Sequence, residues 1–140
     1  MLIHGPSTLE LILERLSGAD GYFDDFELAF FTGYDPRYIV GATPSDKIAS
    51  WSFSSPWATI YNNSAIAAYG PIATTAIKGG AATFWELLAT KSGTPYRLLH
   101  GTAGKKGLGA DIVFTNHIWA MGDTITLNAI YLYPLKLSYT

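Results

Sequence analysis

The chain contains no cysteine and little charge, and both shortages limit what the protein can be. Without cysteine it has no disulfide framework and no thiolate metal site, so its stability has to come from packing. Charged residues make up 14% of the chain, against about 25% in typical soluble domains. The nine basic and eleven acidic residues nearly cancel, so we expect neither nucleic acid nor a membrane surface as a partner.

Targeting and membrane-spanning patterns are also missing. The N-terminal stretch MLIHGPSTLELILERLSG lacks the basic flank, uninterrupted apolar core and cleavage site of a signal peptide. No run approaches the about 20 apolar residues of a membrane helix. We therefore expect a soluble protein made inside a cell, with residues 1–140 forming one domain large enough for a single core.

No stretch of the sequence matches the motif of a catalytic, metal or cofactor site. The stretch GTAGKKGLGAD, Gly101 to Asp111, is rich in glycine, but Lys106 stands where a phosphate-binding loop needs Ser or Thr. A strand-like run follows it in place of the required helix. The three histidines are far apart, the acidic cluster at Asp20 to Glu27 does not fit a calcium loop, and no nucleophile elbow is present. We predict no enzyme activity, no catalytic residue, no metal and no cofactor.

One helix is predicted near the N-terminus. Ser7 and Glu10 form a capping-box pattern, and Gly18 suits the left-handed position that ends a helix. An apolar stripe at helical spacing lies between them, formed by Leu9, Ile12, Leu13 and Leu16. The pattern predicts a helix from about Thr8 to Ser17.

From Phe26 onward, short apolar runs separated by turn residues predict β-strands. The predicted strands are Phe26–Thr32, Ile48–Phe53, about Ile66–Ile77, Ala81–Ala89, Pro95–His100, Asp111–Thr115 and Asp123–Tyr133. Gly93 lies between two of these runs and indicates a β-hairpin, and a change of phase near Asn128 indicates a bulge. The fold class predicted is mainly β, an antiparallel β-sandwich of jelly-roll or immunoglobulin-like type with one short N-terminal helix.

Between Lys47 and Lys78 no charged residue occurs for thirty positions. Two interpretations remain open for this stretch. Its strands are buried in the core of the chain, or this side of the protein is covered by neighbouring subunits, because interface cores lose charge and gain aromatic residues.

Several motifs, in order along the chain, resemble a family of small bacteriophage virion structural proteins. The most specific is GGAATFWELL at Gly79–Leu88, which is similar to the family's Gly-x-Ala-Thr-x-Phe-Arg-Leu. Glu86 stands where that family has arginine, and Lys105–Leu108 looks like an insertion into its glycine turn. The other similar stretches are LAFFTGYDP (28–36), ASWSFSSPW (49–57), HGTAG (100–104), GADIVF (109–114) and HIWAMGDTITL (117–127).

The resemblance implies a component of the virion, made in the host cytoplasm. The leading hypothesis is a capsid decoration or cement protein on the capsid surface, bound non-covalently to the major capsid protein and to copies of itself, as a trimer. One alternative is a tail, baseplate or neck component. Another is a carbohydrate-binding β-sandwich of a head fibre or receptor-binding structure, in which exposed aromatic rings stack on a glycan.

The aromatic residues of the uncharged stretch, together with one later tryptophan, are the predicted interface. The predicted contact residues are Trp51, Trp57, Tyr61, Tyr69 and Trp119, with Glu86, Lys105 and Lys106 as a polar rim. Glu86 is expected to point outward, because it lies on the opposite strand face from Trp85. For each aromatic residue, packing in the core is the alternative.

If Lys105 and Lys106 lie at the tip of an exposed loop, replacing both with alanine should leave the fold intact. Thermal unfolding followed by circular dichroism would measure this, with the unaltered chain as reference. A marked loss of stability would show that the two lysines do not lie in such a loop.

Overall fold

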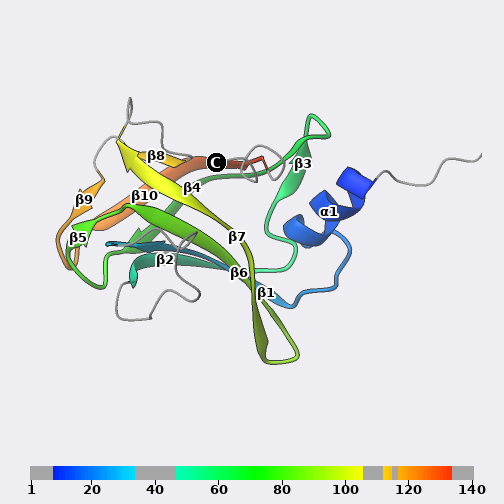
Figure 1. Cartoon of the computed structure of the whole chain (residues 1–140), viewed down its shortest axis with the longest axis horizontal. Coiled ribbons are helices and arrows are strands. Elements are labelled where there is room, and N and C mark those ends of the chain that lie inside the picture. The colour runs from blue at the N-terminus through cyan, green and yellow to red at the C-terminus, as the bar shows by residue number, and fades with distance from the viewer. Residues whose placement is uncertain (1–7, 34–46, 106–111, 115–116, 134–140) are drawn as a thin grey trace, which may run out of the picture.

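Two β-sheets face each other in the computed structural model, which describes residues 8–33, 47–105, 112–114 and 117–133 (Figure 1). The elements are α1 (Thr8–Ser17), β1 (Asp25–Phe31), β2 (Lys47–Ser54), β3 (Thr59–Tyr61), β4 (Ala65–Thr75), β5 (Gly80–Ala81), β6 (Phe84–Lys91), β7 (Thr94–Lys105), β8 (Ile112–Phe114), β9 (Ile118–Trp119) and β10 (Thr124–Leu132). Within its described residues the chain is mainly β, an antiparallel sandwich with one short N-terminal helix, as predicted.

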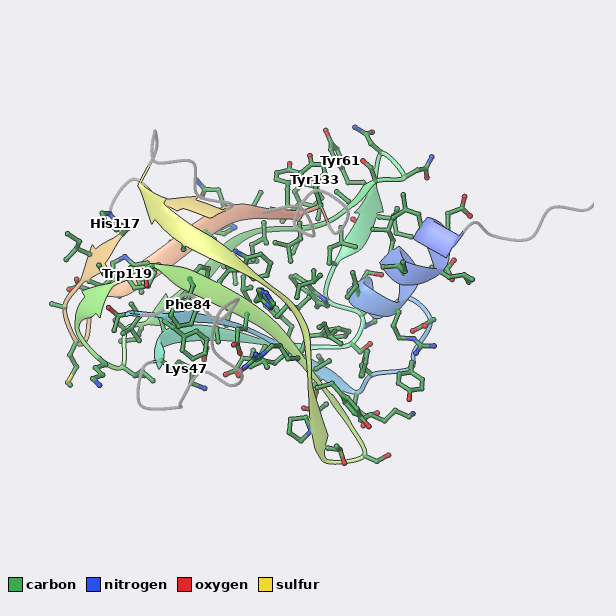
Figure 2. The ribbon with its side chains drawn as sticks, viewed as in Figure 1. Lys47, Tyr61, Phe84, His117, Trp119 and Tyr133 are labelled. Carbon is green, nitrogen blue, oxygen red and sulfur yellow. The ribbon has the colours of Figure 1, made fainter. Side chains whose placement is uncertain are left out.

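The larger sheet has five strands in the order β2-β1-β6-β7-β8, and the smaller has three in the order β10-β4-β3. Neighbouring strands in both sheets are antiparallel, except that β7 and β8 run parallel. A short ribbon of β5 and β9 lies at one end of the sandwich, where Figure 2 labels Trp119, and α1 lies at the other end. The arrangement leaves the outer faces of the two sheets on opposite sides of the molecule.

The two sheets are tied together where β2 approaches β4. The amide of Ile77 donates to the carbonyl of Ile48 at 2.8 Å, and the Thr74 hydroxyl donates to the Ser50 carbonyl at 2.7 Å. The indole N–H of Trp51 donates to the carbonyl of Ile72 at 3.3 Å. These bonds give the edge strand of the larger sheet a partner in the smaller one, and they satisfy polar groups that would otherwise be buried without a partner.

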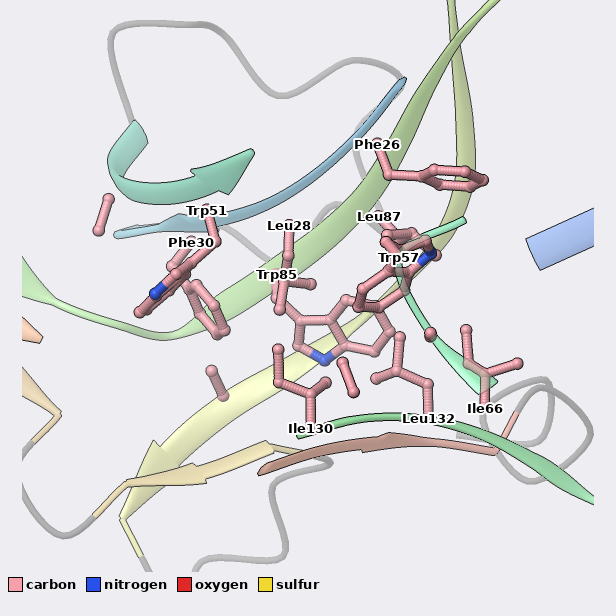
Figure 3. Close-up of a cluster of buried hydrophobic side chains, with 14 of the residues drawn as sticks. Phe26, Leu28, Phe30, Trp51, Trp57, Ile66, Trp85, Leu87, Ile130 and Leu132 are labelled. Carbon is pink, nitrogen blue, oxygen red and sulfur yellow. The ribbon is translucent and has the colours of Figure 1, made fainter. Parts of the chain in front are cut away.

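The core lies between the sheets and is built mainly from residues at alternate positions of the longer strands (Figure 3). Phe26, Leu28 and Phe30 of β1 point into it, because successive side chains of a strand face opposite ways. Ile66 of β4 and Ile130 of β10 meet them from the smaller sheet. Each large side chain that is fully buried in this way contributes roughly 1.5–3 kcal/mol to folding.

Helix α1 has the predicted bounds, and its end is held by a tryptophan from outside the helix. The indole of Trp57 donates to the carbonyl of Leu16 at 2.8 Å, and the Trp57 amide donates to the carbonyl of Ser17 at 3.0 Å. Carbonyls in the last turn of a helix have no partner within the helix, so these bonds satisfy two of them. Gly18 follows with φ of 86°, the predicted left-handed position. Ser7 lies outside the described residues.

The predicted hairpin and bulge are both present. Lys91 pairs with Thr94 across a two-residue turn in which Ser92 and Gly93 have φ of 50° and 81°. Positive φ at both central residues gives a turn whose twist matches that of the strands it connects. The pairing of β10 with β4 shifts register between Leu127 and Ala129, which is the bulge predicted near Asn128.

The predicted strand Pro95–His100 is too short, because the first half of the glycine-rich stretch also belongs to the strand. Strand β7 continues to Lys105, paired with β6 as far as Thr102 and then with β8. Gly101 lies directly opposite Trp85 and is buried, so the missing side chain leaves room for the large indole. The short strands β3, β5 and β9 were not predicted, because two or three residues carry no periodicity.

Substituting Gly18 with alanine should destabilise the fold by roughly 2–4 kcal/mol. A Cβ at this position would collide with the Ser55 hydroxyl and lie 2.9 Å from Cα of Pro56, in addition to the strain of a φ of 86°. Gly21→Ala is the matched control, because its φ is 70° but the space around its Cβ is open. We expect the control to lose only about 1 kcal/mol in urea unfolding. Equal losses in the two variants would contradict the collision.

Candidate functional site

The three tryptophans predicted as contact residues lie in the core of the chain itself, so this part of the predicted interface is wrong. Trp51, Trp57 and Trp119 are only 2%, 9% and 5% exposed. Phe30 meets the rings of Trp51 and Trp119 edge to face, with centroids 5.4 and 6.1 Å apart. Side chains this deeply buried have almost no surface left for a neighbouring subunit.

Glu86 lies on the predicted face of its strand, but it is not exposed. Its side chain points away from the core between the sheets, yet the residue is 3% exposed. Phe31 and Phe84 stack on that same outer face, with centroids 4.9 Å apart and ring planes within 5° of parallel. Together with Leu88 they form a second apolar cluster there. The alternation of the strand predicted the direction of Glu86, whereas its burial depends on residues from a neighbouring strand.

Arg97 provides the counter-charge for the Glu86 carboxylate. Its Nη2 lies 3.0 Å from Oε1, although no donor among the described residues meets that oxygen with hydrogen-bond geometry. Burial raises the pKa of the Glu86 carboxyl above its ordinary value, and the positive charge of Arg97 opposes this shift. Because burial dominates, the folded chain binds the proton of this carboxyl more tightly than the unfolded chain does.

The two predicted rim lysines are not placed by the structure. Lys105 ends β7, and its side chain lies outside the described residues, as does all of Lys106.

Tyr61 and Tyr69 are brought together on the outer face of the smaller sheet. They meet there with Tyr131 of β10, whose ring centroid lies 5.2 Å from that of Tyr61 and 5.9 Å from that of Tyr69. Tyr133 follows two positions after Tyr131, just beyond the end of β10, and is 36% exposed. We call Tyr61, Tyr69, Tyr131 and Tyr133 the tyrosine face.

Small side chains separate the rings of the tyrosine face. In the register of the sheet, Tyr61 is opposite Ala65, Tyr131 is opposite Ala67, and Tyr69 is opposite Ala129. Ala65 and Ala67 are buried, whereas Tyr69 and Tyr131 are 59% and 41% exposed. The rings therefore stand above a floor of alanine, and much of their apolar surface is open to solvent.

The tyrosine face has no charge. Strands β3, β4 and β10 contain no Asp, Glu, Lys or Arg. The solvated face of an antiparallel sheet is usually polar, and exposed aromatic surface without charge is typical of the centre of a protein interface. The chemistry of this face thus favours burial against another macromolecule.

The rings of the tyrosine face are mutually tilted and hydrogen-bonded. Tyr131 lies at 62° to Tyr61 and at 82° to Tyr69, so the three rings form ridges instead of one flat platform. A hydrogen bond with Tyr69 raises the pKa of the Tyr131 phenol above its ordinary value, and burial adds to the shift. The Tyr131 phenol therefore stays uncharged at neutral pH.

Sequence reasoning missed Tyr131 and Tyr133, although a signal for them was present. The bulge near Asn128 reverses which residues of β10 point inward, so that Ile130 and Leu132 enter the core and the tyrosines between and after them point outward. Following this alternation beyond the predicted bulge would have placed both tyrosines on the outer face.

The described ranges contain neither a metal-binding cluster nor a membrane-spanning helix. No group of three or more His, Asp or Glu residues in them could hold a metal ion. The helix in this part of the chain is too short and too polar to cross a membrane.

Neither a protein-family model, nor a curated protein, nor a solved structure matches this chain. The functional interpretation of the tyrosine face therefore depends on its geometry and on the motifs of the sequence.

The Glu86–Arg97 pair should respond differently to the loss of each partner. Arg97→Ala leaves a buried carboxylate without its counter-charge and should lower the free energy of unfolding at neutral pH by roughly 1–3 kcal/mol. Glu86→Gln removes the charge whose burial raises the pKa, so this variant should be at least as stable as the unaltered chain at neutral pH.

Both effects should depend on pH. A carboxyl whose folded pKa is raised contributes stability below its unfolded pKa, and that contribution is lost as the pH rises through the folded value. The loss of unfolding free energy caused by Arg97→Ala should accordingly become smaller in acid, where Glu86 is protonated. Chemical unfolding at a series of pH values would measure this, and a Glu86→Gln variant less stable than Arg97→Ala at neutral pH would contradict it.

Proposed function

We propose that this chain is a structural protein of a bacteriophage particle, and that it acts as a capsid decoration protein by adhering to neighbouring subunits through its tyrosine face. The observation that carries the proposal is the uncharged outer sheet face with its exposed tyrosine rings. The motifs that resemble the bacteriophage family support the assignment to a phage particle, because they occur in order along most of the chain. No chemical step is part of this function.

The tyrosine face suits adhesion because burying it removes apolar ring surface from water and desolvates no charged group on its strands. Covering the exposed part of one tyrosine ring, on the order of 100 Å², gives about 2–3 kcal/mol before the costs of association. No charged group has to lose its hydration on these three strands. Tyrosine is also among the residues that most often dominate the energy of an interface.

Strand β10 gives a second means of contact, through its backbone. It is an edge strand of the three-stranded sheet, and its sequence TITLNAIYL has neither charge nor proline. Proteins commonly protect such edges with lysine or proline, because a free edge can pair with a strand of another chain. Pairing at β10 would extend the sheet that bears the tyrosine face toward another copy, in the proposed trimer, or toward the major capsid protein.

The proposal is tested by substituting two exposed tyrosines, Tyr69→Ala and Tyr131→Ala, in one variant. We expect at least a tenfold loss of affinity for capsids that lack the protein, measured by co-sedimentation, because two anchoring rings are removed. Tyr96→Ala is the matched control, since Tyr96 is 44% exposed but belongs to the larger sheet. Unchanged capsid binding by the double variant would overturn the role of the tyrosine face.

Two further measurements separate the parts of the proposal. Light scattering after size-exclusion chromatography gives the number of copies in the free protein, and a strict monomer would exclude the trimer. The position of the protein in a density map of the virion distinguishes the head from the tail. Density found only below the neck would replace the capsid assignment with the tail or baseplate alternative.

A further inference from the structure

The end of the sandwich that carries the ribbon of β5 and β9 exposes large apolar side chains (Figure 1). Ile77, Ile118 and Met121 are 57%, 60% and 72% exposed, and we call these three residues the apolar tip. The turns at 62–64 and 91–94, by contrast, consist of polar residues and glycine. Apolar side chains gathered at one exposed end are typical of a contact with another molecule.

Backbone hydrogen bonds hold the two segments of the apolar tip together. The amide of Asp123 donates to the carbonyl of Ala120 at 3.0 Å and closes the turn that carries Met121. The amide of Ala76, which precedes Ile77, donates to the carbonyl of Asp123 at 2.9 Å. A tip that is already ordered loses little conformational freedom when it binds.

Ile118 points outward because its neighbour Trp119 points into the core. The ring of Trp119 meets that of Phe30 edge to face, with centroids 6.1 Å apart. Successive residues of a strand face opposite ways, so Ile118 lies on the outer side of the ribbon. It is paired there with Ala81, whose small side chain leaves the isoleucine uncovered.

The outer face of the larger sheet has two adjoining hollows. The first, of about 480 Å³, has Asp25 and Glu27 in its lining, and the second, of about 400 Å³, has Phe31. Leu88 and Pro95 line both, and we call the two hollows together the outer groove. The outer groove is therefore apolar where its hollows meet and acidic in the first of them.

The cations of the outer groove already have ion-pair partners. Lys47 lies 3.1 Å from Glu27, and Arg97 lies 3.0 Å from Glu86. Their aliphatic stems add apolar surface to the groove. Asp25 is exposed and has no ion-pair partner among the described residues, so its carboxylate leaves the first hollow with a net negative charge.

We infer that the apolar tip of one copy of this chain inserts into the outer groove of a second copy. The tip side chains pack against Leu88 and Pro95 of the second copy. Lys78, which is exposed and follows Ile77, then approaches the carboxylate of Asp25.

Volume, charge and area all favour this occupant. A cavity of about 150 Å³ holds a molecule the size of benzene, so the second hollow has room for two side chains of the tip. The opposite charges of Lys78 and Asp25 favour one orientation of the two copies. The tip presents on the order of 300 Å², short of the about 800 Å² per partner of a standard interface. Pairing of tip with tip would thus be too small, whereas the groove surrounds the tip and adds area.

A contact between two different surfaces can repeat from copy to copy. It closes into a ring or continues as a filament. A ring of three copies is the trimer of the proposed function, so the inference rests on that part of the proposal, although it needs no capsid. Within a ring the last contact forms between subunits already held together, which strengthens three individually weak contacts. Neither surface overlaps the tyrosine face, which stays available to the capsid.

Sedimentation velocity of the full chain, from about 10 μM to 1 mM, tests the contact. We expect the unaltered chain to associate reversibly, and the double variant Ile118→Ser with Met121→Ser to associate at least tenfold more weakly. Leu11→Ser is the matched control, because Leu11 is 52% exposed but lies on α1 at the other end of the sandwich. All three side chains are more than half exposed, so the amide spectra of the variants should show an intact fold.

Exchange of charges tests the orientation of the two copies. Lys78→Glu and Asp25→Lys should each weaken association about threefold or more, and the double variant with both changes should recover most of the loss. Such a recovery has to arise between chains. Within one chain the two residues lie near opposite ends of β1, since Asp25 begins the strand and Gly80 lies beside Thr32, which follows its end.

Three outcomes would overturn the inference. A strict monomer at about 1 mM would exclude both this contact and the trimer, and binding of the tip to phosphatidylcholine vesicles would then identify a membrane as its partner. Association that survives the double serine variant would exclude the contact but keep the trimer. Failure of the charge-exchanged variant to recover would do the same. Capsid binding is measured with the tyrosine variants, so the failure of either proposal is distinguishable from that of the other.

Discussion

The burial of Trp85 between the two sheets is the constraint on which the rest of this structure depends. Its side chain is fully buried at the centre of the core, and its indole N–H has no hydrogen-bond partner among the described residues (Figure 3). Leaving that group unpaired costs about 1–3 kcal/mol. Burying about 200 Å² of indole gives roughly 5 kcal/mol, so packing outweighs the lost hydrogen bond. Once Trp85 points inward, the period of two assigns a face to every residue of β6.

The two outer faces differ in chemistry because charge is scarce and unevenly placed. The ion pairs Glu27–Lys47 and Glu86–Arg97 both lie on the larger sheet, whereas the smaller sheet has no charged residue in its strands. One outer face therefore carries ion-paired polar groups, and the other presents uncharged, largely apolar surface.

Local patterns in the sequence were sufficient to predict where the helix and most strands lie. They were not sufficient to predict which faces of those strands are buried. The capping and periodicity of residues 8–17 gave the helix with its observed bounds, and Gly93 and Asn128 marked the hairpin and the bulge, because each signal acts within a few residues. Burial of Trp51 and of Glu86 depends on strands distant in sequence, such as β6 and β7. An aromatic residue in an uncharged run is compatible with a buried core and with an exposed interface. Composition alone therefore could not show that Trp57 is buried and Tyr69 is exposed.

The bonds from Trp57 to the last turn of α1 make the helix and the segment that follows β2 one unit of local stability. The helix cannot leave the sandwich without breaking the bonds that Leu16 and Ser17 accept, and Trp57 cannot leave without exposing its ring from the core. Segments coupled in this way open together and not one by one. The N-terminal helix is thus no detachable arm but part of the folded end of the sandwich.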